Sequence, residues 1–437
     1  MQAFEAKLKE VIDSSFFSNS MYICVLGYAL FKVASRYTSD IFQTFLILGS
    51  LIVLVIYRKK FSHEKTFWLF AATLLIQFIS WINSLYQIPS LAMSSPNLSV
   101  LDDLFMFIFI AFWLKGSQRK TIFFLFSFII GVILSLYLRS EGDFLNHLIR
   151  GVNGQRVDFH ITNAQHTSLI SGAACLYLIT YLSFNWYNSK VYSKSYFLLN
   201  LAILFLFLFL IVVITQSRQV WLALFLAIST LPLTLYLYRK SRSNLFKTSC
   251  FYLLIPMFLI IFSQTSIIKN RLNAEHEIIN SELFESRKNI PISSIGLRIH
   301  FLAESLPWIQ RNTLLGTGEE TRILVIQQST VLPEGIREEF KHLHNSNAET
   351  LVSYGIIGFV ILYILFFYPV IKNCQLRESQ NLDLFKVLGI AFLIYWLIVN
   401  NFESYFYMTS GQWVFNVFFG AIYTFYLTDK ISGKENN

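Results

Sequence analysis

Charged residues and cysteines are scarce in this chain of 437 residues. Only 14% of the residues are Asp, Glu, Lys or Arg, whereas soluble domains carry about 25%. A soluble globular class is therefore excluded. There are four cysteines, and each falls in an apolar run or in a segment that we expect to be cytoplasmic: Cys24, Cys175, Cys250 and Cys374. Because such thiols are kept reduced, we expect no structural disulfide.

Long hydrophobic runs, in contrast, are abundant. Hydrophobic residues make up 54% of the chain, and phenylalanine alone occurs 44 times. A helix needs roughly 20 apolar residues to cross a bilayer. We therefore predict an all-α polytopic membrane protein with about twelve transmembrane helices. The expected spans are residues 17–34, 41–57, 66–82, 100–114, 121–138, 164–186, 196–215, 220–238, 250–262, 350–371, 384–399 and 413–427.

Lysine and arginine are distributed unevenly among the expected loops. They concentrate in residues 58–65, 115–120, 188–194, 239–247 and 372–380 and are missing from residues 83–99. Since cytoplasmic loops carry the positive charge, this pattern predicts that both termini are cytoplasmic. The net charge of +9 follows largely from this topology, so it does not indicate nucleic acid as a partner. No cleavable signal is expected, and residues 4–17 have the pattern of an interfacial amphipathic helix.

Two expected outward segments are longer than tight turns. The first covers residues 139–163, and the second covers residues 263–347, which is far more than a simple connection needs. The second keeps helical periodicity, and we expect it to form a mostly helical periplasmic cap between spans nine and ten. The predicted organisation is thus residues 1–262 with spans one to nine, residues 263–347 as a loop domain, and residues 348–437 with the last three spans and a cytoplasmic tail.

A polar stretch that carries histidine leads directly into span ten, in "HLHNSNAETLVSYGIIG" at residues 342–358. Ser346 and Glu349 match a capping box, so span ten should begin just after His344. A neutral imidazole at this outward mouth can accept a proton. Gly355 and Gly358 are expected on one helix face, where they would allow close packing.

The sequence offers no clear motif for a metal. Asp102 and Asp103 are adjacent, so on a helix their side chains would point about 100° apart. His342 and His344 are two residues apart and would not share a helix face. We therefore predict that no metal is bound and that no cofactor is needed.

Three segments carry a resemblance to a known family. His344-Asn345, nine residues, then Gly355-x-x-Gly358 matches the signature of the O-antigen ligase family. "TQSRQVWLAL", at residues 215–224, is similar to that family's Ser-Arg-x-x-Trp-Leu segment. "GLRIHFLAESLPWIQRNTLLGTG", at residues 296–318, resembles its periplasmic arginine helix and the turn that follows. The resemblance covers residues 215–359 by motif and the whole chain by topology, and it implies a GT-C-like fold.

The resemblance also implies an activity. Family members transfer polysaccharide from undecaprenyl diphosphate to an outer-core sugar of lipid A-core at the periplasmic face of the inner membrane, by a metal-independent, inverting reaction. His344 would take the proton from the attacking hydroxyl, and Arg218 and Arg298 would bind the diphosphate, since guanidinium grips phosphate bidentately. Candidate substrate contacts are Asn345, Arg156, His166 and Trp308.

Each of these residues also has a simpler interpretation. Arg218 could be an interfacial anchor at a helix end, and Arg298 could lie on the solvated face of an amphipathic helix. His344 could be a polar flank of span ten. Trp308 could pack or anchor at the interface. Asp102 and Asp103 could cap a helix.

Three other functions fit the same features. An O-antigen polymerase or a protein O-oligosaccharyltransferase would use the same kind of donor, although the latter usually has an additional C-terminal region. A lipid-linked oligosaccharide flippase would be a transporter without a catalytic histidine. It should carry polar residues deep in its spans, whereas this sequence concentrates them at the outward rim.

Overall fold

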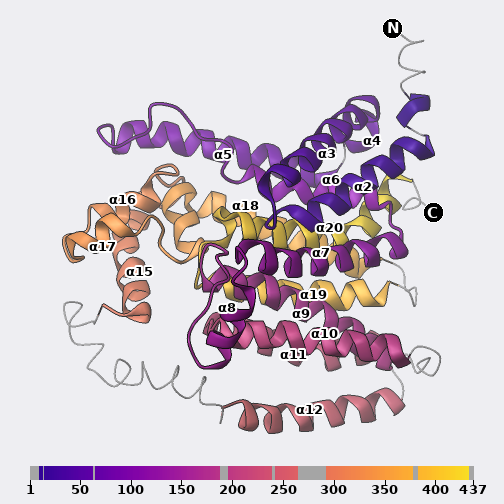
Figure 1. Ribbon diagram of the computed structural model, residues 1–437. Helices are drawn as coiled ribbons and strands as arrows, with labels where there is room; N and C mark the ends of the chain where they lie inside the picture. The colour runs from indigo at the N-terminus through magenta and orange to yellow at the C-terminus, as the bar shows by residue number, and fades with distance from the viewer. Residues whose placement is uncertain are drawn as a thin grey trace.

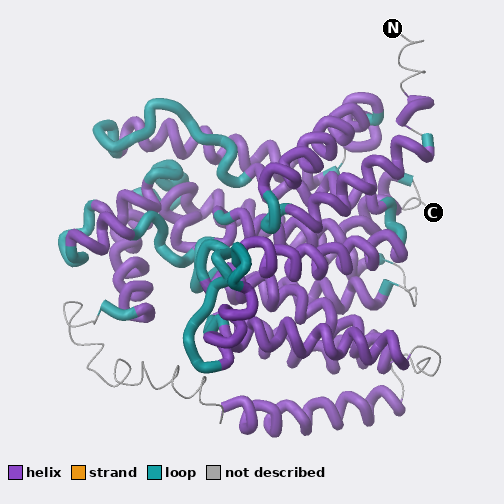
Figure 2. Tube along the Cα trace, in the orientation of Figure 1, coloured by secondary structure: helices purple, strands orange, loops and turns teal. Residues whose placement is uncertain are grey.

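The computed structural model describes residues 9–12, 14–62, 64–187, 195–238, 242–263, 292–376 and 382–432. Helices account for nearly all regular structure in these residues, and no strand occurs among them (Figure 2). Most of the long helices run side by side in one bundle (Figure 1). The described part of the chain is therefore all-α, as the sequence predicted.

Every predicted span falls on a helix. Seven helices in the described ranges are long and apolar enough to cross a membrane: α3 (Arg36–Ile56), α5 (Lys65–Gln87), α7 (Gln118–Arg139), α9 (Ala164–Tyr187), α10 (Ser195–Ile214), α11 (Arg218–Tyr238) and α18 (Ser346–Gln375). The other predicted spans fall on α2 (Ser15–Phe31), α6 (Met106–Leu114), α12 (Arg242–Ser263), α19 (Asp383–Val399) and α20 (Thr409–Ile431). The polytopic membrane class is confirmed, and the number twelve stays a prediction.

Helix α20 is the most enclosed of these helices. Every residue from Ser410 to Leu427 is buried, and α20 packs on α6, α18, α19 and α9. Asn416 fixes the packing with α6, because its Oδ1 accepts from the Phe107 N–H at 2.9 Å and its Nδ2 donates to the Asp103 carbonyl at 2.6 Å. Asp102 and Asp103 themselves form the first turn of a short 3₁₀ helix, η1 (Asp102–Phe105), rather than its N-cap.

A small helical layer covers one end of the bundle. It contains α15 (Ser294–Arg311), α16 (Thr321–Gln327) and α17 (Glu334–Glu339), and we call residues 292–345 the cap segment. In Figure 1 this layer lies at the end of the bundle away from the chain termini. Its own apolar cluster includes Phe301, Val325 and Leu343 and extends onto Ala348 and Val352 of α18. Pro307 does not end α15, which continues to Arg311.

Helix α18 is broken at Gly355, whose φ of 63° and ψ of −167° are not helical. At this break the Ile356 N–H donates to the Thr313 carbonyl at 2.8 Å. A Cβ at Gly355 would lie 2.3 Å from the Leu314 carbonyl oxygen, so only glycine fits. The prediction that Gly355 and Gly358 share one regular helix face is therefore wrong.

The turn at residues 316–318 docks into the same break. The Thr317 N–H donates to the Val352 carbonyl at 3.0 Å, and the Gly318 N–H donates to the Ser353 carbonyl at 2.9 Å. A Cβ at Gly316 would lie 2.4 Å from the backbone of Ser353. Two motifs that are distant in sequence thus join the cap segment to the first turns of α18.

Candidate active site

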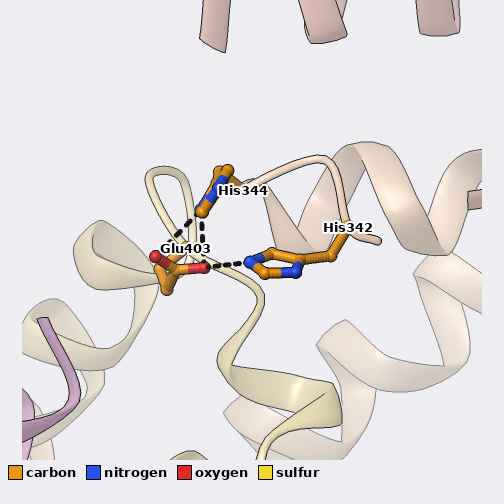
Figure 3. A group of neighbouring side chains, drawn as sticks. All are labelled: His342, His344 and Glu403. Atoms are coloured by element: carbon orange, nitrogen blue, oxygen red, sulfur yellow. Dashed lines mark hydrogen bonds and ion pairs between the residues drawn. The ribbon is translucent and has the colours of Figure 1, made fainter. Parts of the chain in front are cut away.

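His344 lies in the connection between α17 and α18, where its backbone is left-handed with a φ of 52°. Its Nδ1 is 2.9 Å from Oε1 and 3.0 Å from Oε2 of Glu403 (Figure 3). The ring stacks near Phe301, with centroids 6.1 Å apart, and meets the edge of Phe340 at 5.6 Å. With Nδ1–H donating to a carboxylate, the neutral ring carries its lone pair on Nε2, so Nε2 is the atom able to accept a proton.

Glu403 is shared by two histidines. Its side chain is fully buried, and His342 Nε2 lies 3.2 Å from Oε1, with the two imidazole centroids 4.2 Å apart (Figure 3). Burial raises the pKa of Glu403, but the hydrogen bonds from His342 and His344 and the positive charge of these histidines lower it by more, so the net pKa of Glu403 is well below the usual range. Burial lowers the pKa of His342, but the hydrogen bond to Glu403 and the negative charges of Glu403 and Glu349 together outweigh burial, and the net pKa is raised.

Asn345 is the N-cap of α18. Its Oδ1 accepts from the N–H groups of Asn347 and Ala348, both at 3.0 Å, and its Nδ2 donates to the Asn401 carbonyl at 3.0 Å. The expected capping box of Ser346 and Glu349 is therefore wrong. Ser346 Oγ instead donates toward Asn400 Oδ1 and the Glu403 carbonyl. The N-cap lies one residue earlier than the motif predicts, because Asn345 precedes Ser346 and its side chain accepts from the first N–H groups of the helix.

Arg298 of α15 reaches the segment that carries Glu403. Its Nε donates to the Phe402 carbonyl at 3.1 Å, and its Nη1 donates to the Ser294 carbonyl at 2.8 Å. The amide of Gln165, at the start of α9, completes the link. It is best placed with its nitrogen on Glu403 Oε2 and its oxygen 3.0 Å from Arg298 Nη2. Arg298 and His344 therefore belong to one cluster, connected through Glu403 and Gln165.

The segment before α11 approaches the same cluster. Arg218 is the first residue of α11 and is half-buried, and the amide of the next residue, Gln219, lies 2.8 Å from the Gln165 amide. Arg156 is exposed and donates from Nε to the Thr215 carbonyl at 3.3 Å, three residues before Arg218. The fold thus brings the start of α11 and the loop of Arg156 toward the His344 cluster.

Two further candidates take part in packing. His166 is 2% exposed, its Nδ1 is hydrogen-bonded to Ser410 Oγ, and its ring meets the edge of Tyr405. Trp308 packs against the apolar cluster of the cap segment. His166 is closed off from solvent in this conformation and Trp308 is half-buried, and the role of both in substrate binding stays a prediction.

His342 and His344 lie close together, contrary to the prediction from their spacing. They lie outside any helix, and their imidazoles converge on one carboxylate. One ligand atom from each of His342, His344 and Glu403 lies within 4.8 Å of the others, which is a donor set that also suits a divalent ion such as zinc. The sequence spacing therefore gives no argument against a metal, and the expected absence of one is left to experiment.

Residues 203–363 match the protein-family model described as O-Antigen ligase. That match supports an assignment to the O-antigen ligase family. It covers the Arg218 segment, the Arg298 helix, His344 and the glycine at the break in α18. No curated protein matches the chain at a significant level. The family indicates an enzyme of the glycosyl-transfer type, with lipid-linked polysaccharide and a lipid acceptor as substrates, and the apolar helices indicate a multi-pass membrane protein.

Sequence reasoning missed Glu403 and Gln165. Glu403 follows His344 by 59 residues and lies in the short connection between α19 and α20, outside the family match. A local signal did exist, since "NNFESYF" places one acid between two highly apolar helices, where an unpaired charge is expensive. Gln165 carries no such signal, because a neutral amide at a helix start is ordinary.

Proposed function

We propose that the protein is an O-antigen ligase that transfers polysaccharide from undecaprenyl diphosphate to an outer-core sugar of lipid A-core. The reaction takes place at the periplasmic face of the bacterial inner membrane, with both termini in the cytoplasm. The observation that carries the proposal is the pairing of His344 Nδ1 with the buried Glu403 carboxylate. This is the arrangement of a base and its orienting acid, in which the second imidazole nitrogen accepts the proton.

In the proposed step, the acceptor hydroxyl loses its proton to His344 Nε2 and its oxygen attacks the anomeric carbon of the donor. The bond from that carbon to the diphosphate oxygen breaks, and undecaprenyl diphosphate leaves with the electron pair. Attack opposite the leaving group inverts the anomeric centre. Glu403 stabilises the imidazolium that forms, because its carboxylate is buried and faces Nδ1.

Arg298 and Arg218 supply positive charge for the leaving diphosphate. Charge-assisted hydrogen bonds of this kind contribute about 1.5–3 kcal/mol each. Arg298 is supported as a ligand of diphosphate by its link to Glu403 through Gln165. Arg218 is supported by its place at the start of α11, where helix N–H groups also favour an anion.

The decisive experiment replaces His344 by Ala in a host that lacks its own ligase, and follows the lipopolysaccharide profile. We expect polymer-bearing lipopolysaccharide to disappear, because general-base catalysis contributes about 10²–10⁴-fold to rate. Lys341→Ala, an exposed change in the same loop, serves as the control. Unchanged ligation by His344→Ala would remove His344 as the base.

Three further measurements separate the alternatives. Purified protein treated with a chelator should keep its activity, and a strict requirement for added zinc would instead favour a metal held by His342, His344 and Glu403. Longer chains on the lipid carrier, with none on lipid A-core, would indicate a polymerase. Transport of the lipid-linked donor that does not depend on His344 would indicate a flippase.

A further inference from the structure

Glu349 in the first turn of α18 has a fully buried carboxylate that joins two parts of the site. Its Oε1 accepts from the Leu343 N–H at 2.6 Å and from Ser404 Oγ at 2.6 Å. Leu343 stands between His342 and His344, and Ser404 follows Glu403. One carboxylate oxygen therefore connects the histidine segment to the segment of the acid that orients His344.

The other oxygen of Glu349 faces Arg322 of α16. Arg322 Nη1 lies 3.8 Å from Glu349 Oε2, and Nη2 lies 2.8 Å from Oε1 of Glu319. The guanidinium also lies over the ring of Tyr407, 4.8 Å from its centroid. Burial lowers the pKa of Arg322, but Glu349, Tyr407 and Glu319 raise it, and the net pKa is raised. Arg322 therefore stays cationic. Burial raises the pKa of Glu349, and the charge of Arg322 is the largest influence that opposes this rise.

Helix capping does not explain this carboxylate. The first N–H groups of α18 are satisfied by Asn345, and Ser346 makes a separate contact with the Glu403 carbonyl. Taking two charges out of water costs several kcal/mol per ion. The hydrogen bond from the Leu343 N–H to Glu349, directly between the two histidines, gives a reason for burying this carboxylate despite the cost.

We propose that Glu349 and Arg322 are positioning residues for His344. The inference rests on the proposed role of His344 as base. Glu349 fixes the backbone of the histidine segment relative to Glu403, and Arg322 keeps Glu349 ionised so that its oxygen accepts strongly from Leu343. Neither residue touches the reacting atoms in this account. Their effect on rate comes from the placement of the imidazole, where an error of about 1 Å costs about 10²-fold.

The test measures transfer kinetics and backbone exchange on the full-length protein in detergent. Glu349→Ala should lower kcat about 10²-fold with little change in KM for the lipid-linked donor, and Glu349→Gln should lower it about tenfold because a neutral amide oxygen is a weaker acceptor. In both variants hydrogen exchange at the Leu343 amide should accelerate at least tenfold. Glu338→Gln, an exposed change on α17, is the matched control.

A double variant tests the role of charge. Arg322→Met should lower kcat, because it leaves Glu349 as a buried charge without its cation, and Arg322→Met with Glu349→Gln should recover part of the loss. Arg311→Met, at an exposed position on α15, is the control for the loss of an arginine. A purely structural role would lower the yield of folded protein and leave the kcat of the folded fraction unchanged.

Two results would overturn the inference: wild-type kcat in Glu349→Ala, or unchanged exchange at Leu343. The exchange readout does not depend on the reaction. If His344→Ala stays active, the proposed function fails. Hydrogen exchange at the Leu343 amide then still tests whether Glu349 holds this part of the backbone. If His344→Ala is inactive while the Glu349 and Arg322 variants are fully active, only the positioning role fails.

Discussion

Two buried carboxylates, Glu403 and Glu64, lie in different environments. Glu403 is fully buried and faces two histidines. Glu64 is 1% exposed, accepts from the Tyr423 hydroxyl, pairs with Lys430 at 3.0 Å, and caps α5 through the Thr66 N–H. Both acids have close partners, but those of Glu403 are two imidazoles, the side chains most often used for general acid–base catalysis, whereas those of Glu64 are a phenol, a lysine and a backbone amide. Burial and pairing of a carboxylate alone therefore do not mark an active site. The chemistry of the side chains that contact the carboxylate does.

Neutralising each acid in turn tests whether only Glu403 takes part in the reaction. Glu403→Gln should lower transfer about 10²–10⁴-fold, because the amide can hold His344 in the wrong tautomer and cannot stabilise the imidazolium. Glu64→Gln, made in parallel, should leave the transfer rate of folded protein near wild type. A transfer assay on both purified variants checks this. Equal losses would show that the two acids do the same structural work.

The next largest effect is expected at the arginines. Arg298→Lys should lower kcat/KM about tenfold or more, since Lys keeps the charge but loses the planar fork that binds diphosphate. Arg218→Lys should act in the same direction. Transfer kinetics with varied donor concentration check both, and Arg311→Lys is the control. A fully active Arg298→Lys variant would contradict bidentate binding at that position.

Removing the Glu64 carboxylate should lower the stability of the protein without lowering its transfer activity. Glu64→Ala leaves the Tyr423 hydroxyl and the Thr66 N–H without their acceptor, and a buried donor left unpaired costs about 1–3 kcal/mol. Thermal unfolding in detergent should show a lower Tm. Wild-type Tm in this variant would mean that water replaces the carboxylate without cost.

The smallest expected effect is on the pH dependence of stability. His342 has a raised pKa, so its contribution is complete below about pH 6.5 and is lost as pH rises through the raised value. Glu403 has a lowered pKa, so its contribution is complete above about pH 4.5 and is lost as pH falls. Stability from this pair should therefore be greatest between about pH 4.5 and 6.5.

The unfolding temperature at pH 5.5 and at pH 8 measures this effect. The decrease toward pH 8 should become smaller in His342→Gln and persist in Lys430→Gln, because Lys430 pairs with Glu64 and not with His342 or Glu403. The opposite ranking of the two variants would assign the alkaline loss to another group.

Much of the fold could be predicted because its signals are local. Every span predicted from an apolar run falls on a helix, and the motif from Asn345 to Gly358 predicted where α18 begins. The errors were also local, and they arose where one pattern has two structural solutions. Asn345 rather than Ser346 caps the helix, and Gly355 breaks α18 instead of lying on a regular face.

The sequence by itself determined the helical membrane class, and it pointed to the O-antigen ligase family and to His344 as the candidate base, since hydropathy, periodicity and short motifs depend only on neighbouring residues. Only the tertiary structure decided that Glu403 orients His344, that Gln165 links it to Arg298, and that Glu349 and Arg322 hold the histidine segment. Apart from the hydrogen bond between Leu343 and Glu349, these contacts join residues that are tens to hundreds of positions apart in the chain. Their geometry follows from how the helices pack, and no local pattern encodes it.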